Sequence, residues 1–364
     1  MIGNSISMNM PKKKVLFFLP NSVGGAERVT ITIAKMLDVD RYDVKFVIVG
    51  RSLGDIVQFI PENYDTKLLH VFNIWDFATC KMVRLLKKER PQVVFSSLRY
   101  LNVRVITASN IVGGIKTVVR NENTLQTLNM LNYYLVKCSY PKADIVVAQQ
   151  EEMRQEIIAE IKLPADKVVV LHNPLDIETI NKKLNNSTNP YPKVEGIKYV
   201  WVGRVSYLKG QDVLIKALSI VHKKDGNSHL YFVGKFSEND NYYRAIYNEI
   251  INLGLQDFVH FVGYTDNPYA WMKYADCFVL PSRIEGLPNS LIEAMYIGKP
   301  VVATTCIPVI ERIVNDGING ILVKSEDYEA MANAMQSALY LKMGQLHYQP
   351  ASYMDVCNLF ELPS

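Results

Sequence analysis

The chain has 364 residues, of which 49% are hydrophobic and 21% charged. This composition is typical of a soluble globular protein, and the length favours two domains over a single hydrophobic core. The net charge of +4 is too small to indicate nucleic acid binding, and the five cysteines form no C-x-x-C pair, which argues against a disulfide framework and a zinc site.

The charge is unevenly distributed along the chain. Residues 1–167 carry 23 Lys and Arg against 16 Asp and Glu, whereas the remainder carries 17 against 20. A basic first half facing an acidic second half predicts that the first half meets something anionic. Phosphorylated lipid, a membrane surface and nucleic acid all fit that charge.

The N-terminal stretch MIGNSISMNMPKKKVLFFLPNS does not read as an export signal. Its apolar run, VLFFLP, is only six residues long, which is too short for such a signal. No part of the sequence approaches the roughly 18 uninterrupted apolar residues of a membrane-spanning helix. We therefore expect a cytoplasmic protein.

Short β-branched runs alternate with segments of helical period, which is typical of repeated βαβ units around a parallel sheet. In the first half, strands are expected at 14–19, 43–50, 92–97, 115–120 and 144–149, and helices at 24–38, 76–90 and 125–139. In the second half, strands are expected at 198–203, 229–234, 258–263, 276–282 and 299–304.

Between the halves, residues 175–196 lose the apolar rhythm and gather Asn, Lys and Pro, so the later part of this segment is interpreted as a linker. The sequence thus predicts an α/β protein of two doubly wound, Rossmann-like domains, 1–185 and 186–340, whose parallel sheets face one another across a cleft. Residues 341–364 form a weak terminal helix pattern. In such sheets ligands bind at the carboxyl ends of strands, so the turns there should carry the chemistry.

The first such turn lies in FFLPNSVGGAERVT, where a strand runs into Gly24-Gly25 and then a helix. Glycines allow a ligand to approach the backbone, and the helix N-terminus offers N–H groups to an anion. Neither the G-x-G-x-x-G fingerprint nor a Walker A loop is present. A plain strand-to-helix turn is the alternative interpretation.

The second turn lies in VWVGRVSYLKGQDV, where Arg204 follows Gly203 and Lys209 precedes a helix. A guanidinium and an ammonium group aimed into a cleft suit a diphosphate, because they neutralise a leaving group as its charge grows. The alternative is that both are solvated loop charges.

The third segment, SRIEGLPNSLIEAMYIGKP (282–300), places Glu285 in a Gly/Pro turn and Glu293 in an apolar helix start. Ser290 and Glu293 have the spacing of a capping box, which would account for Glu293 without any ligand. Alternatively, Glu285 accepts hydrogen bonds from sugar hydroxyls and Glu293 from vicinal ribose hydroxyls. Both interpretations of Glu293 are compatible, because a carboxylate has about four acceptor positions.

Residues 81–90 (KMVRLLKKER) are amphipathic and basic. A solvated helix packed on its own sheet explains this pattern. The alternative is peripheral contact with an anionic membrane, as a lipid-linked acceptor would require.

Three motifs occur in this order: Gly-Gly-Ala-Glu-Arg at 24–28, Gly203-Arg204 with Lys209-Gly210, and Glu285 separated by seven residues from Glu293. Together they resemble the large family-4 group of retaining GT-B glycosyltransferases over residues 14–335. The similarity is greatest to bacterial members that build capsule, O-antigen, exopolysaccharide or glycan-lipid intermediates.

The resemblance implies roles for several residues in binding a nucleotide sugar. Arg204 and Lys209 would hold the diphosphate and, with Glu285, act in catalysis. The remaining donor-binding residues implied are Gly24 and Gly25 at the phosphates and acceptor, Gly203 beside Arg204, Tyr264 near the base, Glu293 at the ribose, and Glu285, Gly286, Leu287 and Asn289 at the sugar. It also implies that 341–364 returns to the N-terminal domain.

The sequence departs from the family at one position. Many members have a histidine after the fourth strand of the first domain, where this chain reads VVRNENTLQ. Arg120, Glu122 and Asn123 are therefore the acceptor-side candidates, and Glu122 or Asn123 would take over the histidine's role unless the reaction proceeds without it.

The resemblance thus implies a metal-independent retaining glycosyltransferase without a cofactor, in polysaccharide or glycoconjugate synthesis. It would move a hexose or N-acetylhexosamine from a nucleoside-diphosphate sugar, with UDP favoured, to a glycan or lipid-linked acceptor. Its partners would be these substrates and an anionic membrane at the inner face of the plasma membrane, without nucleic acid. A catalytically silent GT-B scaffold and a sugar-nucleotide epimerase are the alternatives.

Overall fold

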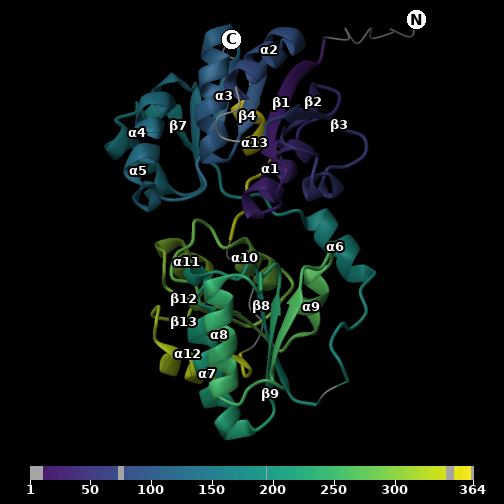
Figure 1. The fold of residues 1–364 in the computed structure, drawn as a ribbon, viewed down its shortest axis with the longest axis vertical. Coiled ribbons are helices and arrows are strands. Elements are labelled where there is room, and N and C mark those ends of the chain that lie inside the picture. The colour runs from purple at the N-terminus through teal and green to yellow at the C-terminus, as the bar shows by residue number, and fades with distance from the viewer. Residues whose placement is uncertain (1–10, 73–77, 194, 342–347, 362–364) are drawn as a thin grey trace, which may run out of the picture. The chain divides into compact units, whose positions relative to one another are not determined.

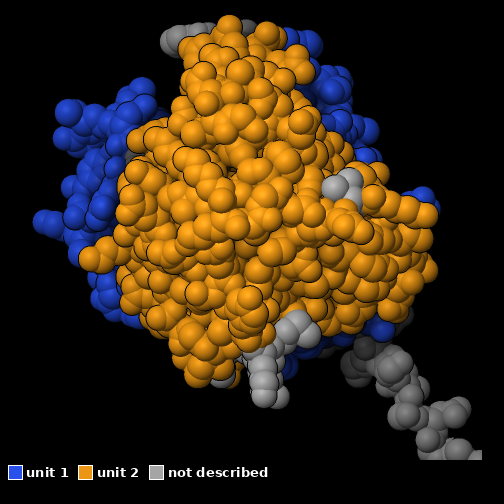
Figure 2. All heavy atoms as spheres, turned by 90° about the horizontal axis from the view of Figure 1, so that it is seen from below, with its two compact units in different colours: residues 1–175, 350–364 blue, residues 176–349 orange. Residues whose placement is uncertain are grey.

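The computed structural model describes residues 11–72, 78–193, 195–341 and 348–361. The chain divides into two compact units, which are shown in Figures 1 and 2. Unit 1 comprises residues 1–175 and 350–364, and unit 2 comprises residues 176–349.

Unit 1 contains one parallel sheet of seven strands. In spatial order these are β3 (Asp65–His70), β2 (Tyr42–Gly50), β1 (Lys13–Pro20), β4 (Val93–Ser96), β5 (Lys116–Arg120), β6 (Ile145–Ala148) and β7 (Val168–Val170). β1 is central, and its register places Phe17 beside Phe46 of β2 and Phe95 of β4. These rings pack together in the core.

Helices cover both faces of this sheet (Figure 1). They are α1 (Gly25–Lys35), α2 (Ala78–Glu89), α3 (Arg99–Val112), α4 (Met130–Ser139), α5 (Glu151–Ile161) and α13 (Tyr353–Phe360), with the short turns η1 (Asp55–Phe59), η2 (Leu125–Thr127), η3 (Tyr140–Lys142) and η4 (Ala165–Lys167). α1 and α13 pack on the face that carries Phe17, whereas α2 and α3 pack on the face that carries Leu16 and Phe18. Successive strand residues point to opposite faces, which explains the two cores.

Unit 2 contains a parallel sheet of six strands. In order these are β10 (Val259–Gly263), β9 (Ser228–Val233), β8 (Ile197–Val202), β11 (Cys277–Leu280), β12 (Val301–Thr304) and β13 (Gly320–Val323). Its helices are α6 (Ile177–Asn185), α7 (Gln211–Asp225), α8 (Asn241–Asn252), α9 (Pro268–Tyr274), α10 (Asn289–Tyr296), α11 (Pro308–Ile313) and α12 (Tyr328–Ala338), with the turn η5 (Tyr207–Lys209). α7 and α12 pack over Trp201 and Phe232, and Trp271 of α9 stacks on Tyr231 from the other face.

The predicted α/β class with two doubly wound parallel sheets is confirmed, and all ten expected strands are present. Three strands were missed. All three are edge strands that are only partly buried, so they lack the fully buried apolar character of strands inside a parallel sheet. The helix expected at 125–139 begins only at Met130, and residues 76–77 of the second expected helix lie outside the described part.

The division between the units falls at residues 175 and 176, and not at 185 and 186. Contacts of α6 explain the difference, because this helix is tied to unit 2. Tyr296 donates to Asn181 at 3.1 Å, and Asn267 donates to the carbonyl of Lys183 at 3.1 Å. The other boundary falls at 349 and 350, and not at 340 and 341.

The C-terminal helix α13 packs into the core of unit 1. Phe360 is fully buried, and its ring lies 5.6 Å from that of Phe17 and 5.8 Å from that of Phe95. The helix begins with a capping box between Ser352 and Asp355. No helix in the described ranges is long and apolar enough to cross a membrane.

Replacing Phe360 by Ala should therefore destabilise unit 1 by about 3–5 kcal/mol, because the change leaves a cavity among aromatic rings. The matched control is Met354→Ala, an exposed residue of the same helix, which should stay within about 0.5 kcal/mol of the parent chain. Thermal and urea unfolding measure both variants. Equal stability of the two would show that α13 is not part of the core of unit 1.

Candidate functional site

The site in unit 2 lies where the strand order of the sheet reverses. β8 and β11 are neighbours, and the chain continues from β8 to one edge of the sheet and from β11 to the other. Ligands of doubly wound sheets bind at such a switch point, beyond the carboxyl ends of the strands. Gly203 and Arg204 follow β8, and the turn that holds Glu285 follows β11.

Two glycines let the loops beyond these strands come together. Gly210, at the start of α7, has φ +68°, and a Cβ there would lie 2.0 Å from the carbonyl oxygen of Pro281. A Cβ on Gly234 would lie 1.7 Å from the carbonyl oxygen of Gly203. Only glycine fits either position without a backbone shift. Gly210 therefore allows η5 to lie against the residue that follows β11.

The predicted residues Lys209 and Glu285 form an ion pair. Lys209 Nζ lies 2.7 Å from Glu285 Oε1, and their side chains are 31% and 7% exposed. Ser282 Oγ donates to the same oxygen at 2.8 Å. The carboxylate is thus buried and held from two sides, whereas the ammonium group is open to solvent and to a ligand.

Arg283, which the sequence analysis did not select, holds the two loops of this pair together. Its Nη1 and Nη2 donate to the two carboxylate oxygens of Asp212 at 2.8 and 2.7 Å, and Nη1 also donates to the carbonyl of Tyr207 at 2.7 Å. The guanidinium lies 4.1 Å from the centre of the Tyr207 ring. Its backbone N–H donates to the carbonyl of Leu208 at 2.9 Å. Both ends of η5 are therefore fixed to the loop that carries Glu285.

The charges of this clamp stabilise one another. Burial alone would raise the pKa of Asp212, but hydrogen bonds from Arg283 and Tyr242 outweigh it and lower the pKa. The hydrogen bond to Asp212 in turn raises the pKa of Arg283. A paired, half-buried arginine of this kind fixes geometry because its planar donors match a carboxylate.

The expected capping box of Ser290 and Glu293 is wrong. Pro288 is the N-cap of α10 and no side chain caps the helix, so Ser290 lies inside the first turn. Glu293 lies one turn further in, where its Oε1 accepts a hydrogen bond from Tyr269 at 3.2 Å. The capping explanation of Glu293 therefore fails, and the ribose interpretation stays a prediction.

The remaining donor-side candidates of unit 2 lie in loops that follow its strands or at the start of α10. Gly286 and Leu287 are buried beside Glu285, and Asn289 begins α10. Arg204 is exposed. Tyr264 follows β10, and the ammonium group of Lys235 lies 5.2 Å from the centre of its ring. Lys235 follows β9 and was not anticipated.

Gly24 and Gly25 lie at the switch point of the sheet of unit 1, between β1 and β4. Gly24 caps α1, which begins at Gly25. A Cβ on Gly24 would lie 2.6 Å from Glu27 Oε2, so the buried carboxylate of Glu27 folds back over the start of its own helix. Glu27 belongs to the Gly-Gly-Ala-Glu-Arg motif, but no role was predicted for it from the sequence.

Glu122 follows the neighbouring strand β5. Its carboxylate accepts a hydrogen bond from the backbone N–H of Arg99, at the start of α3. Burial, and next the charge of Glu27, raise its pKa to about 7. Gln149 fixes the backbone here by donating to the carbonyl of Glu122 at 2.7 Å. The carboxyl group of Glu122 thus lies within the electrostatic influence of Glu27 in the same unit.

The other two acceptor-side candidates are placed differently. Arg120 is buried, and its Nη2 donates to Asn173 Oδ1. The carbonyl of Asn123 accepts from the side chain of Asn121 at 2.6 Å. Only Glu122 brings an ionisable group to the sheet edge. Across the described residues, no group of three or more His, Cys, Asp or Glu could hold a metal ion.

Two family models match the chain, and together they span most of it. Residues 23–179 match the model described as glycosyltransferase family 4, and residues 196–340 match the model described as glycosyl transferases group 1. The first match begins just after β1 and covers the other six strands of unit 1, and the second match covers all six strands of unit 2.

Individual proteins agree with these models. An uncharacterised glycosyltransferase of Haemophilus influenzae is 28% identical, over 91% of this chain and 93% of its own length. The Campylobacter jejuni N-acetylgalactosamine-N,N'-diacetylbacillosaminyl-diphospho-undecaprenol 4-alpha-N-acetylgalactosaminyltransferase is 23% identical, over 90% of this chain and of its own length.

Among solved structures, Anabaena HepE in complex with UDP-glucose matches with a TM-score of 0.74, at 21% identity over 90% of each chain. A likeness at this identity shows the fold, which is GT-B. Two family models match consecutive parts of the chain, one in each unit. The chain therefore belongs to the family-4 glycosyltransferases of the GT-B fold.

Proposed function

We propose that this glycosyltransferase moves a hexose or N-acetylhexosamine from a UDP-sugar to a glycan or lipid-linked acceptor, with retention of anomeric configuration and without a metal ion. The observation that carries the proposal is the ion pair of Lys209 and Glu285 at the switch point of unit 2. The UDP-glucose complex of HepE supports the donor, and the name of the Campylobacter relative supports a polyprenyl-diphosphate acceptor.

Positive charge for the departing diphosphate comes from Arg204 and Lys209. Preorganised cations stabilise the charge that grows on a leaving group, in the place of a divalent ion. Glu293 accepts from the ribose hydroxyls beside Tyr269, and Tyr264 lies at the base. Gly24 and Gly25, at the start of α1, approach the phosphates and the acceptor.

The donor sugar contacts Glu285, Asn289 and the backbone of Gly286 and Leu287. The bond between the anomeric carbon and the diphosphate oxygen breaks while the acceptor oxygen attacks from the same face. The hydroxyl proton of the acceptor passes to the departing diphosphate. Lys209 and Ser282 hold the carboxylate of Glu285 throughout, so the sugar meets a fixed acceptor of hydrogen bonds.

On the acceptor side, Glu122 takes the place of the histidine that many family members have. A carboxyl group with a pKa of about 7 is partly protonated in neutral solution and can donate as well as accept a hydrogen bond. Arg120 and Asn123 would then support its loop. The basic face of residues 81–90 contacts an anionic membrane, and we propose the inner face of the plasma membrane as the place of action.

Transfer itself tests the proposal. With UDP-sugars, EDTA and short glycan or polyprenyl-diphosphate acceptors, NMR should show a product with the anomeric configuration of the donor. Lys209→Ala should lower kcat about 100-fold, the scale of losing one preorganised donor. Lys223→Ala, an exposed lysine of α7, is the matched control and should keep full activity.

Other outcomes of this experiment would contradict the proposal. Interconversion of UDP-sugars without an acceptor would indicate an epimerase. Donor binding without transfer to any acceptor would indicate a silent scaffold. Full activity in both Lys209→Ala and Glu285→Ala would remove these residues from the site.

The environment of Glu122 generates a pH prediction. Its pKa is raised from 4.5 to about 7 in the folded state, so between these values the folded chain keeps a proton that the unfolded chain releases. The stability of unit 1 should therefore fall as the pH rises through this window. The side chain in Glu122→Gln cannot titrate. The melting temperature of this variant, relative to that of the parent chain, should therefore rise from pH 5 to pH 7 and stay constant at higher pH.

Unfolding of both chains at a series of pH values measures this difference. Glu62→Gln, which changes an exposed carboxylate of the same unit, is the control and should follow the parent chain. Parallel profiles for Glu122→Gln and the parent chain would show that Glu122 ionises normally.

A further inference from the structure

Helix α4 in unit 1 presents an apolar stripe to solvent. Met130, Leu131, Tyr134 and Leu135 are 76, 70, 57 and 44% exposed, and Cys138 continues the row. Their spacing of one, four and five residues places them on one side of the helix. We call these five residues the α4 stripe. The opposite side of α4 is buried in the core through Val136 and Ser139.

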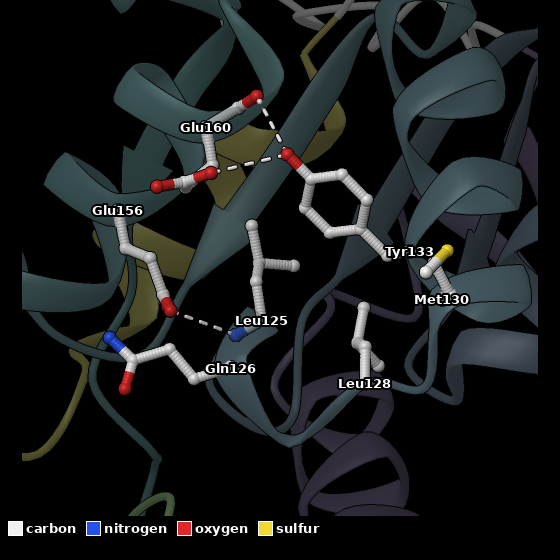
Figure 3. A pocket seen from close by; sticks show the side chains of 7 residues that line it. All are labelled: Leu125, Gln126, Leu128, Met130, Tyr133, Glu156 and Glu160. Carbon is white, nitrogen blue, oxygen red and sulfur yellow. Dashed lines mark hydrogen bonds between the residues drawn. The ribbon is translucent and has the colours of Figure 1, made fainter.

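The polar flank of α4 lies beside the stripe and does not interrupt it. A cavity of about 340 Å³ is lined by η2, α4 and α5 (Figure 3). Tyr133 donates to Glu160 at 3.1 Å, and the backbone of Leu125 donates to Glu156 at 3.0 Å. The carboxylates on this flank are thus turned to partners in α4 and η2. The stripe itself contains no charged side chain, so it suits an apolar occupant.

Lysines stand at the C-terminal end of the stripe. Lys137 lies within α4, and Lys142 ends the turn that follows. Lys167 donates to the carbonyls of Pro141 and Ala143, both at 3.2 Å, and so lies beside that turn. Apolar and aromatic side chains bordered by lysines are typical of surfaces that enter the headgroup region of an anionic bilayer.

Helix α2 belongs to the same packed group of helices as α4. α3 packs between α2 and α4. On α2, Met82, Leu85 and Leu86 are buried in the core, and Arg84, Lys87 and Lys88 are exposed. The basic face predicted at residues 81–90 therefore offers little apolar surface to a bilayer, because the one remaining apolar side chain in this range, Val83, is half-buried. For contact with a bilayer, α2 therefore offers positive charge, and α4 offers apolar side chains.

We propose that the α4 stripe inserts into the headgroup region of an anionic lipid bilayer, with the lysines beside it and the basic face of α2 against the phosphates. This inference extends the lipid-linked acceptor of the proposed function, since it places unit 1 on the surface that holds such an acceptor. A second copy of the chain is the alternative occupant, and the experiment below distinguishes it from a bilayer.

Vesicle binding tests this proposal without donor or acceptor. The full chain should sediment with vesicles of 30% phosphatidylglycerol in phosphatidylcholine, and less with pure phosphatidylcholine. Leu131→Glu with Leu135→Glu should weaken the partition coefficient about tenfold or more, because charge replaces buried apolar surface. Lys137→Glu should weaken it about fivefold and reduce its dependence on salt. Ile318→Glu, an exposed apolar residue of unit 2, is the matched control and should bind like the parent chain.

The readouts distinguish this inference from the proposed function. Transfer to a short water-soluble acceptor should be unchanged in the double variant, whereas transfer to a polyprenyl-linked acceptor in vesicles should fall with binding. Equal vesicle binding by the parent chain and the double variant would overturn the inference. A parent chain that is dimeric in sedimentation equilibrium, becomes monomeric in the double variant and ignores vesicles would also overturn it, and would assign the stripe to a second copy.

Discussion

The contact of Gly210 with the end of β11 is the constraint on which the site in unit 2 depends. A Cβ at this position would lie 2.0 Å from the carbonyl oxygen of Pro281. Because glycine has no Cβ, the turn before α7 can lie against the loop after β11. Arg283 then fixes this approach through Asp212 and Tyr207. Lys209 and Glu285, which are 76 residues apart in sequence, meet as an ion pair only for this reason.

Unit 1 uses the same topology for a different electrostatic purpose. There, burial and next the charge of Glu27 in α1 raise the pKa of Glu122, which follows β5. Unit 2 instead gathers cations beside a buried carboxylate. The cation-lined edge suits a diphosphate leaving group, and an edge with a partly protonated carboxyl group suits the hydroxyls of an acceptor. The two sheets are thus similar in topology, but different ionisable groups lie beyond their strands.

Much of this organisation was readable from the sequence. Buried strands are recognisable in the sequence as β-branched runs, and motifs at strand ends pointed to Lys209 and Glu285. Glu122 was selected because it lies where many family members have a histidine. The sequence could not show Arg283, because a charged residue in a loop has no pattern that reveals its partner. The sequence also suggested a capping box at Ser290. In the structure Pro288 occupies the N-cap position, and no side chain caps the helix. The α4 stripe was hidden because apolar periodicity does not say which side of a helix faces the core.

Nucleotide binding to unit 2 tests the central claim most directly. In EDTA, we would record melting curves with UDP, GDP, ADP and TDP, since a ligand of the folded state raises the melting temperature. The account predicts that UDP raises the melting temperature, that Glu293→Ala abolishes the rise, and that Glu329→Ala, which removes an exposed carboxylate of α12, retains it. No rise with any of the four nucleotides would contradict the assignment of Arg204, Lys209 and Glu293 to a donor site.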